Sequence, residues 1–409
     1  MKTLINDLVM LTLTCTITVA QTSASDWPQW RGENRDAKVS DFKAPATWPK
    51  ELKQEWRVPV GDGVATPSYV KGRLFVIGRE AGSEIVRCLD GETGKEIWKD
   101  SYETLAATGP ASSYSGPRSS PTVASGKAIT YGLRATLSCY DAESGKVIWR
   151  KESVPNAWPS FFTSSSPLIE DGFCITQLGG TTNGVIAALN LATGEEKWKW
   201  TGDASQYGSP MIGTIAGTKI VIAQTDKRLV ALRLSDGTFL WGSPFAGSGM
   251  GGMNTGTPII SNDTVIYSGS GRGVTAVKFE KDGDSLKAAE LWSNKDNSIQ
   301  YNSPILKDSM VFGYSAKDDL FCIDAKDGKT RWTTPIPGKR GYGSIVDVGD
   351  ALLLLTPTGT LTVFGPNEKE FKQIASYKVA EGATTAYPIL TGDHLYVKDK
   401  DSVTKWTIE

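Results

Sequence analysis

The segment RCLDGETGKEIW, from Arg87 to Trp98, places a thiol, carboxylates, a glycine turn and an indole within twelve residues. Groups of these types at close spacing can hold a ligand or act as bases. The phrase recurs along the chain, however, in copies that end at Trp149, Trp198, Trp241, Trp292 and Trp332. Because so many copies cannot all be active sites, we interpret the segment as a repeated structural fastener.

Other candidates for catalysis are few. His394 is the only histidine in the sequence, so a His-rich zinc site and c-type haem attachment are excluded. A Ser-His-Asp triad would have to use this one turn residue. The segment GSGRGV, Gly269 to Val274, has the glycines of a dinucleotide loop, but no helix pattern follows it, so we expect a hairpin turn. No catalytic residue and no metal ligand is assigned.

The elements that carry the fastener repeat with it. A small residue followed by proline precedes a β-rich run at Pro67, Pro121, Pro167, Pro210, Pro258 and Pro304, and two looser copies have Ile345 in the seventh place and Pro388 in the eighth. These markers define eight units of roughly 40 to 54 residues, each with four short strands. One four-stranded sheet cannot bury enough surface alone, but sheets stacked around an axis can. The sequence predicts an all-β, eight-bladed β-propeller of four-stranded antiparallel blades.

We expect the fastener tryptophans to fill the gaps between adjacent blades, since an indole is large, flat and has one N–H to satisfy. The last unit ends after its third strand, and Leu52 to Val60 has the character of a fourth strand. The N-terminal strand is therefore predicted to close the last blade and cover its edge. The predicted docking residues are Trp56, Trp98, Trp149, Trp198, Trp241, Trp292 and Trp332.

The cysteines fit the same repeat. Cys88, Cys139 and Cys322 occupy one position, two residues before the Asp site, in three different blades, and Cys174 lies out of register. Equivalent atoms of different blades lie farther apart than the roughly 5.5 Å Cα separation of a disulfide. We interpret all four as buried, small apolar residues.

The first residues have the pattern of an export signal. Lys2 precedes the apolar run Leu8 to Ala20, which is too short to span a bilayer, and small residues follow it. We expect a signal peptide over residues 1–24, cleaved near Ala20 or Ala24, and a periplasmic or secreted protein without a transmembrane segment. Residues 25–51, with Trp27, Trp30 and Arg31, are predicted to strap across a face of the propeller domain, residues 52–409; ligand contact is the alternative role.

The repeated phrase LDxxTGxxxW resembles the tryptophan-docking motif of pyrroloquinoline-quinone-type (PQQ-like) propellers. That superfamily includes quinoprotein alcohol dehydrogenases and the propeller lipoprotein of the outer-membrane assembly machinery. The leader DWPQWRGENRD resembles the start of many uncharacterised exported bacterial propellers, although Glu33 replaces their usual proline. The sequence lacks the adjacent Cys-Cys pair of the dehydrogenases, and the context of Cys15 does not match a lipid-attachment site.

Residues just before each inner strand are the candidate binding site. In a propeller, the chain there crosses from one blade's rim to the centre of the next, so these side chains surround one mouth of the channel. Aromatic faces mixed with Arg and Asn are typical of small-molecule or peptide sites, while simple filling of the channel is the alternative. The candidates are Arg118, Tyr207, Asn254, Tyr301, Asn302, Arg340, Tyr342 and Tyr387.

Lys plus Arg (44) nearly balances Asp plus Glu (45), so no net field attracts nucleic acid. The sequence favours an exported, monomeric, non-catalytic propeller that binds a protein, peptide or small molecule of the cell envelope through its channel mouth and loops, with no cofactor. Two alternatives stay open. One is a quinoprotein dehydrogenase, which would need PQQ and a calcium ion with oxygen ligands. The other is a propeller subunit of an outer-membrane protein assembly complex.

Overall fold

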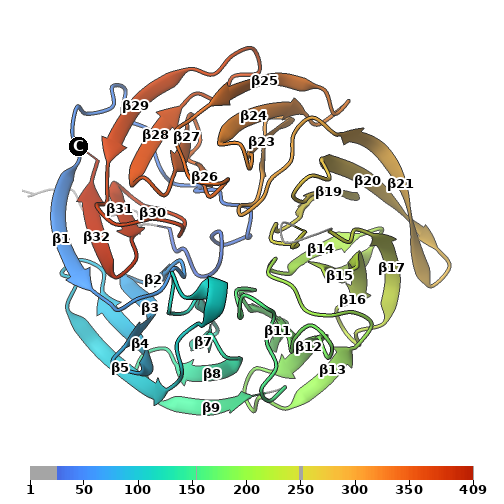
Figure 1. Cartoon of the computed structure of the whole chain (residues 1–409), viewed down its shortest axis with the longest axis horizontal. Coiled ribbons are helices and arrows are strands. Elements are labelled where there is room, and N and C mark those ends of the chain that lie inside the picture. Colours follow the sequence, from blue (N-terminus) through green and yellow to red (C-terminus); the bar gives the residue numbers. More distant parts are fainter. Residues whose placement is uncertain (1–24, 153, 248–251, 409) are drawn as a thin grey trace, which may run out of the picture.

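Eight four-stranded sheets stand in a ring in a computed structural model that describes residues 25–152, 154–247 and 252–408 (Figure 1). All neighbouring strands within these sheets are antiparallel. The predicted all-β, eight-bladed propeller is therefore confirmed. The predicted signal peptide lies outside the described residues.

The strands of the first four blades run in chain order from the centre to the rim. They are β2 (Ser68–Val70), β3 (Arg73–Glu80), β4 (Ser83–Asp90) and β5 (Glu96–Glu103); β6 (Thr122–Ala124), β7 (Lys127–Tyr131), β8 (Thr136–Asp141) and β9 (Val147–Glu152); β10 (Leu168–Glu170), β11 (Phe173–Leu178), β12 (Val185–Asn190) and β13 (Glu196–Trp200); and β14 (Met211–Ile215), β15 (Thr218–Gln224), β16 (Arg228–Arg233) and β17 (Phe239–Pro244).

The other four blades follow the same plan, except that the last takes its outer strand from the N-terminal part of the chain. Their strands are β18 (Ile259–Ser261), β19 (Thr264–Ser268), β20 (Val274–Asp282) and β21 (Ser285–Asn294); β22 (Ile305–Lys307), β23 (Met310–Tyr314), β24 (Asp319–Asp324) and β25 (Thr330–Pro335); β26 (Ser344–Asp347), β27 (Leu352–Leu355), β28 (Thr360–Phe364) and β29 (Gln373–Lys378); and β30 (Ile389–Thr391), β31 (His394–Lys398), β32 (Ser402–Thr407) and β1 (Lys53–Pro59). A short 3₁₀ helix, η1 (Gly109–Ala111), lies in the loop between the first two blades.

Tryptophans of the outer strands join neighbouring blades. The Nε1–H of Trp98 donates to the carbonyl of Ala142 at 3.2 Å, and that of Trp149 donates to Leu191 at 3.0 Å, in each case at the turn of the next blade. Trp198, Trp292 and Trp332 donate in the same way to Leu234, Ala325 and Asn367. Each bond satisfies the one polar atom of the indole, so the ring itself can fill the gap between the sheets.

Trp241 departs from this pattern. Its ring packs edge-on against Phe279 of β20, with the centroids 4.8 Å apart. The hairpin of β20 and β21 is longer than its counterparts, so its turn at Gly283 lies beyond the reach of this indole. Tyr377, which replaces the tryptophan in blade seven, donates its hydroxyl to the carbonyl of Pro49 at 2.7 Å.

The ring closes through β1, which pairs antiparallel with β32 and completes the last blade. Trp56 of β1 donates to the carbonyl of Glu92 in blade one at 2.9 Å, so the closing strand also carries a docking indole. The N-terminal strand thus closes the propeller as predicted.

The four cysteines of the described residues are free and buried, as the sequence predicts. Burial raises the pKa of the Cys88, Cys139 and Cys322 thiols to about 12, so they stay protonated and inert. Among the described residues, no helix has the length and apolar character needed to cross a membrane.

Candidate functional site

The strap, residues 25–51, enters the centre of the ring instead of only crossing a face of it (Figure 1). The backbones of Trp27 and Tyr69 of β2 exchange hydrogen bonds of 2.7 and 2.8 Å. Farther along, the Val39 N–H donates to the Asp347 carbonyl of β26, and the Asp347 N–H donates to Ala37, both at 2.8 Å. The strap therefore connects the inner strands of blades one and seven.

Side chains of the strap reach three further blades. The Nε1–H of Trp30 donates to Thr257 Oγ1 of blade five at 3.1 Å, and Arg31 Nη2 donates to the Pro304 carbonyl of blade six at 2.7 Å. Arg35 donates to the carbonyls of Ser166 and Pro167 in blade three, each at 3.0 Å. These carbonyls lie where the chain enters an inner strand, so the strap supplies donors at points where the chain passes between blades.

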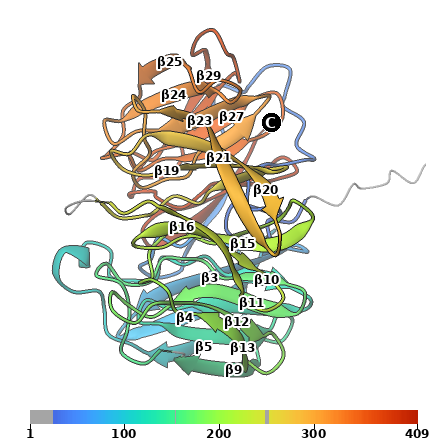
Figure 2. The ribbon, with the colours of Figure 1, turned by 90° about the vertical axis from the view of Figure 1, so that its right-hand side faces the viewer.

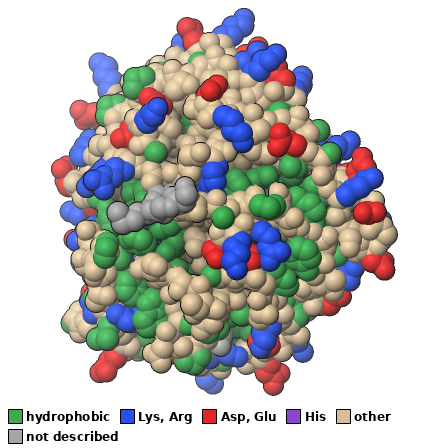
Figure 3. All heavy atoms as spheres, turned by 45° about the vertical axis from the view of Figure 1, so that its right-hand side comes forward, with side chains coloured by type: hydrophobic (Ala, Val, Ile, Leu, Met, Phe, Trp, Pro, Cys, Tyr) green, Lys and Arg blue, Asp and Glu red, His purple; other side chains and the backbone are tan. Residues whose placement is uncertain are grey.

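A cavity of about 750 Å³ lies at the end of the channel where the inner strands begin. We call it the mouth cavity. Trp30 of the strap is part of its wall, and the loop with η1 stands on the same side of the ring, opposite the entry of the strap (Figure 2). In the space-filling view, hydrophobic side chains gather toward the middle of this face (Figure 3). The predicted residues that line the cavity are Arg118, Tyr207, Tyr301, Asn302, Arg340, Tyr342 and Tyr387.

Aromatic rings dominate the lining. Tyr301 and Tyr342 stack with their centroids 4.5 Å apart. The Tyr207 hydroxyl accepts a hydrogen bond of 3.0 Å from the Phe161 N–H, which fixes its ring. Burial, with the nearby Tyr301, raises the pKa of Tyr342 to about 12, and burial also raises the pKa of Tyr207. These hydroxyls are neutral at physiological pH and can donate to a ligand.

The charged side chains among the described residues of the lining are all basic. Arg118 Nη2 donates to the carbonyls of Ala111 and Tyr114 at 3.1 and 2.9 Å, so this residue holds the η1 loop in place. Burial lowers the pKa of Arg118. Lys339 and Arg340 are exposed beside the cavity. The cavity thus combines aromatic faces with an excess of positive charge, which suits a ligand with apolar and anionic groups.

Asn254 is the one predicted mouth residue that does not line the cavity. Its side chain is buried, and its Nδ2 donates to the carbonyls of Thr225 and Phe245 at 2.6 and 3.0 Å. Asn302 touches the cavity, but its Nδ2 donates to the carbonyls of Tyr314 and Gly341. Lys339, which we did not single out, lines the cavity; its position beside Arg340 in the sequence is the signal for it.

The lining does not suit the calcium ion of a quinoprotein. Guanidinium and ammonium groups repel a cation, which needs oxygen ligands. Asp203, the carboxylate just upstream of Tyr207, is held by Arg228 Nε and Nη2 at 2.9 Å each and by Thr225. Burial opposes its charge, but these hydrogen bonds outweigh burial and lower its pKa. Among the described residues, no group of three or more His, Cys, Asp or Glu could hold a metal ion.

Repeat, blade number and docking indoles together define an eight-bladed propeller of the PQQ-like class. Within this class, residues 82–334 match the family described as outer membrane protein assembly factor BamB, and the chain belongs to this family.

Known relatives agree with this assignment. The chain is 25% identical over 351 residues to the outer membrane protein assembly factor BamB of Moranella endobia, covering 81% of this chain and 82% of the relative. The crystal structure of BamB from Moraxella catarrhalis superimposes with a TM-score of 0.64 at 15% identity, over 88% of this chain and 98% of that one. The quinohemoprotein alcohol dehydrogenase of Comamonas testosteroni superimposes with a TM-score of 0.70 at 14% identity, over 93% of this chain and 80% of that one. The two structural likenesses concern the fold.

Proposed function

We propose that this protein is an exported, non-catalytic propeller of the cell envelope that binds a protein partner during the assembly of outer-membrane proteins. The family match over residues 82–334 supports the assembly role, because it spans most of the blades. Its site of action would be periplasmic, with no cofactor needed. The sequence alone favours a more general binding role, and the family match favours the assembly role over it.

The observation that carries the proposal is the mouth cavity. Stacked Tyr301 and Tyr342, the exposed Arg340 and the partly buried Trp30 face one opening. Tyrosine, tryptophan and arginine are the residue types that carry most of the binding energy in protein interfaces. A loop or a chain end of the partner would enter this opening and stop at Trp30, where the strap fills the channel.

Site-specific photocrosslinking tests the proposal. A photoreactive amino acid in place of Tyr301 should crosslink, in the bacterial envelope, to a component of the outer-membrane assembly machinery that mass spectrometry identifies. The same amino acid in place of Leu291, which is 50% exposed on the outer strand β21, is the matched control and should give no such product. Equal crosslinking from both positions, or products without any assembly component, would contradict the proposal.

Binding and folding can be separated with a double variant. Tyr301→Ala with Arg340→Ala should weaken partner copurification about ten-fold or more, because two interface anchors are lost, with the melting temperature unchanged. We expect purified protein mixed with PQQ and calcium to leave the quinone spectrum unaltered. A red-shifted quinone band with dye reduction on alcohols would favour the dehydrogenase alternative instead.

A further inference from the structure

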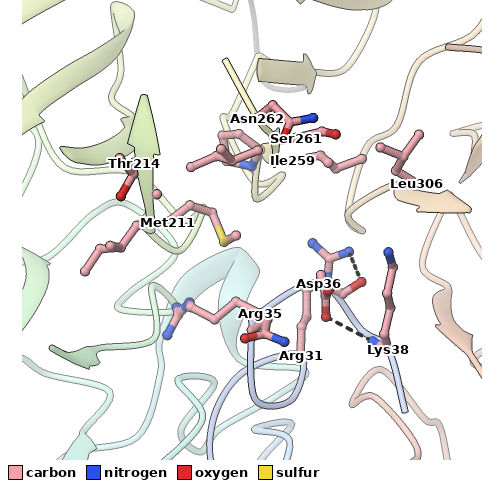
Figure 4. Close-up of a pocket in the computed structure, with 15 residues that line it drawn as sticks. Arg31, Arg35, Asp36, Lys38, Met211, Thr214, Ile259, Ser261, Asn262 and Leu306 are labelled. Carbon is pink, nitrogen blue, oxygen red and sulfur yellow. Dashed lines mark hydrogen bonds between the residues drawn. The ribbon is translucent and has the colours of Figure 1, made fainter. Parts of the chain in front are cut away.

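A second cavity, the strap cavity, lies between the strap and the inner strands of three blades (Figure 4). Its volume is about 420 Å³. The strap forms one wall, and the inner strands β14, β18 and β22 of blades four, five and six form the other. Among the described residues, none lines both cavities. Trp30 of the strap lines the mouth cavity, whereas Arg31 and Arg35 line the strap cavity.

Positive charge is concentrated on the strap wall. Arg31 and Arg35 are buried, with 1% and 3% of their surface exposed, and Lys38 is exposed at the rim. Among the described residues that line the cavity, Asp36 is the one acidic residue. Its backbone carbonyl accepts from Arg31 Nη2 at 3.5 Å, and its Oδ1 accepts from the Lys38 N–H at 3.2 Å. Neither buried arginine forms an ion pair within the part of the chain that the structure describes.

The hydrogen bonds of these two arginines are incomplete. In the described part of the chain, Arg31 Nε and Nη1 and Arg35 Nε are buried without a hydrogen-bond partner. Figure 4 shows the Arg31 guanidinium between the strap backbone and the wall that contains Ile259 and Leu306. Burial, together with the charge of Arg31, lowers the pKa of Arg35 to about 9. Buried charges normally have a counter-charge, because an unpaired one is costly to desolvate.

We propose that the strap cavity binds an oxyanion, a carboxylate or a phosphate, beside Arg31 and Lys38, with the charge of Arg35 nearby. The anion supplies the counter-charge and accepts hydrogen bonds from guanidinium groups, which suit carboxylate and phosphate oxygens. The facing wall includes Met211, Ile259 and Leu306, an apolar surface that suits a short hydrocarbon attached to the anionic group. This site is independent of the mouth cavity and of the partner proposed for it.

Calorimetric titration of the full mature chain distinguishes the sources of such an anion. Octanoate, octanol and inorganic phosphate are the three probes. Binding of octanoate, but not of octanol, assigns the site to a carboxylate on an apolar chain. Comparable binding of phosphate and octanoate assigns it to a free oxyanion. Binding of octanol as tight as that of octanoate, or binding of no probe, overturns the proposal.

Variants at the rim of the cavity tie the binding to this site without disturbing the buried arginines. Lys38→Gln should weaken octanoate or phosphate binding about three- to ten-fold, because a partly exposed ion pair is lost. Asp36→Asn should tighten binding by a similar factor, since a like charge is removed. Lys43→Gln, an exposed strap lysine outside the cavity lining, is the matched control and should change nothing. Unchanged affinity in both Lys38→Gln and Asp36→Asn, with unaltered melting temperatures, overturns the proposal.

Discussion

Contact between neighbouring blades is made by an indole that lies against a glycine. Gly145, Gly194, Gly237 and Gly328 have φ between +72° and +74° at the turn of one blade, and each faces the docking tryptophan of the blade before it. The positive φ makes the tight turn, and the missing Cβ leaves room for the ring. Gly94 faces Trp56 of the closing strand in the same way.

Replacing one such glycine tests the indole contact separately from backbone strain. A Cβ at Gly194 would lie 2.8 Å from Trp149 Cδ2, whereas a Cβ at Gly172 would meet nothing within 4 Å; the φ values, +72° and +76°, are nearly equal. Both Gly→Ala variants therefore carry the same strain, and only Gly194→Ala displaces the indole. We expect Gly194→Ala to lose about 1–3 kcal/mol more unfolding free energy than Gly172→Ala in urea titrations. Equal losses would show that the indole contact is not what the glycine protects.

Lys398 links the last blade to the segment that leads into the first. Its side chain is 1% exposed, and its Nζ donates to the carbonyls of Gly63, Asp399 and Lys400 at 2.8, 3.1 and 3.3 Å. Burial lowers its pKa from 10.5 to about 8, although Asp399 and other nearby acids oppose the shift. Compared with the unfolded chain, the folded protein therefore loses the proton of Lys398 at a lower pH.

This shift predicts a pH-dependent stability. Between the folded pKa of about 8 and the unfolded value of 10.5, the unfolded chain binds more protons, so a higher pH stabilises the fold. Lys398→Met removes the contribution of this amine to the pH dependence. The difference in unfolding free energy between wild type and Lys398→Met therefore excludes the tyrosines and cysteines that titrate in the same range. From pH 7 to pH 9, wild type should gain about 1 kcal/mol of unfolding free energy relative to Lys398→Met. A constant difference would place the folded pKa outside this window.

At the scale of elements, the blades were predictable and the strap was only partly so. Most blades repeat the same turn, glycine and indole, so the repeat length of the sequence predicts the number of blades and their four strands. The strap has no period, and its partners, Tyr69 and Asp347, lie far away in the sequence. The sequence predicts a strap across one face, whereas its place inside the channel depends on these long-range backbone pairs.

The candidate site was likewise predictable only in part. The propeller topology predicts which loops surround the mouth, and it brings Arg118, Tyr301 and Tyr342 to one cavity. It does not predict how one side chain turns. Asn254 points into the protein because two buried carbonyls need a hydrogen-bond donor there. The repeat pattern of the sequence does not predict these two contacts. Similarly, the exception at Trp241 follows from the length of a single hairpin.

At the scale of the whole molecule, closure of the ring depends on one strand borrowed from the other end of the chain. Lys53 of β1 lies opposite Thr407 of β32, so the two strands could be joined directly by a hairpin. A circular permutant that begins at Gly61, runs to Thr407 and continues through an Asn-Gly turn into residues 53–60 would rebuild the last blade from contiguous sequence.

The matched control is the chain from Gly61 to Thr407, which lacks β1; neither form contains the strap. Removing β1 exposes the edge of β32 and deletes the indole of Trp56, which docks on blade one. We expect the control to lose on the order of 5 kcal/mol, since a docked tryptophan and a strand ladder are both gone, and to self-associate through its open edge. The permutant should be monomeric in light scattering and should melt cooperatively. Two equally stable monomers would mean that blade one and blade eight hold together without the closing strand, and that the ring is maintained by its inner strands alone.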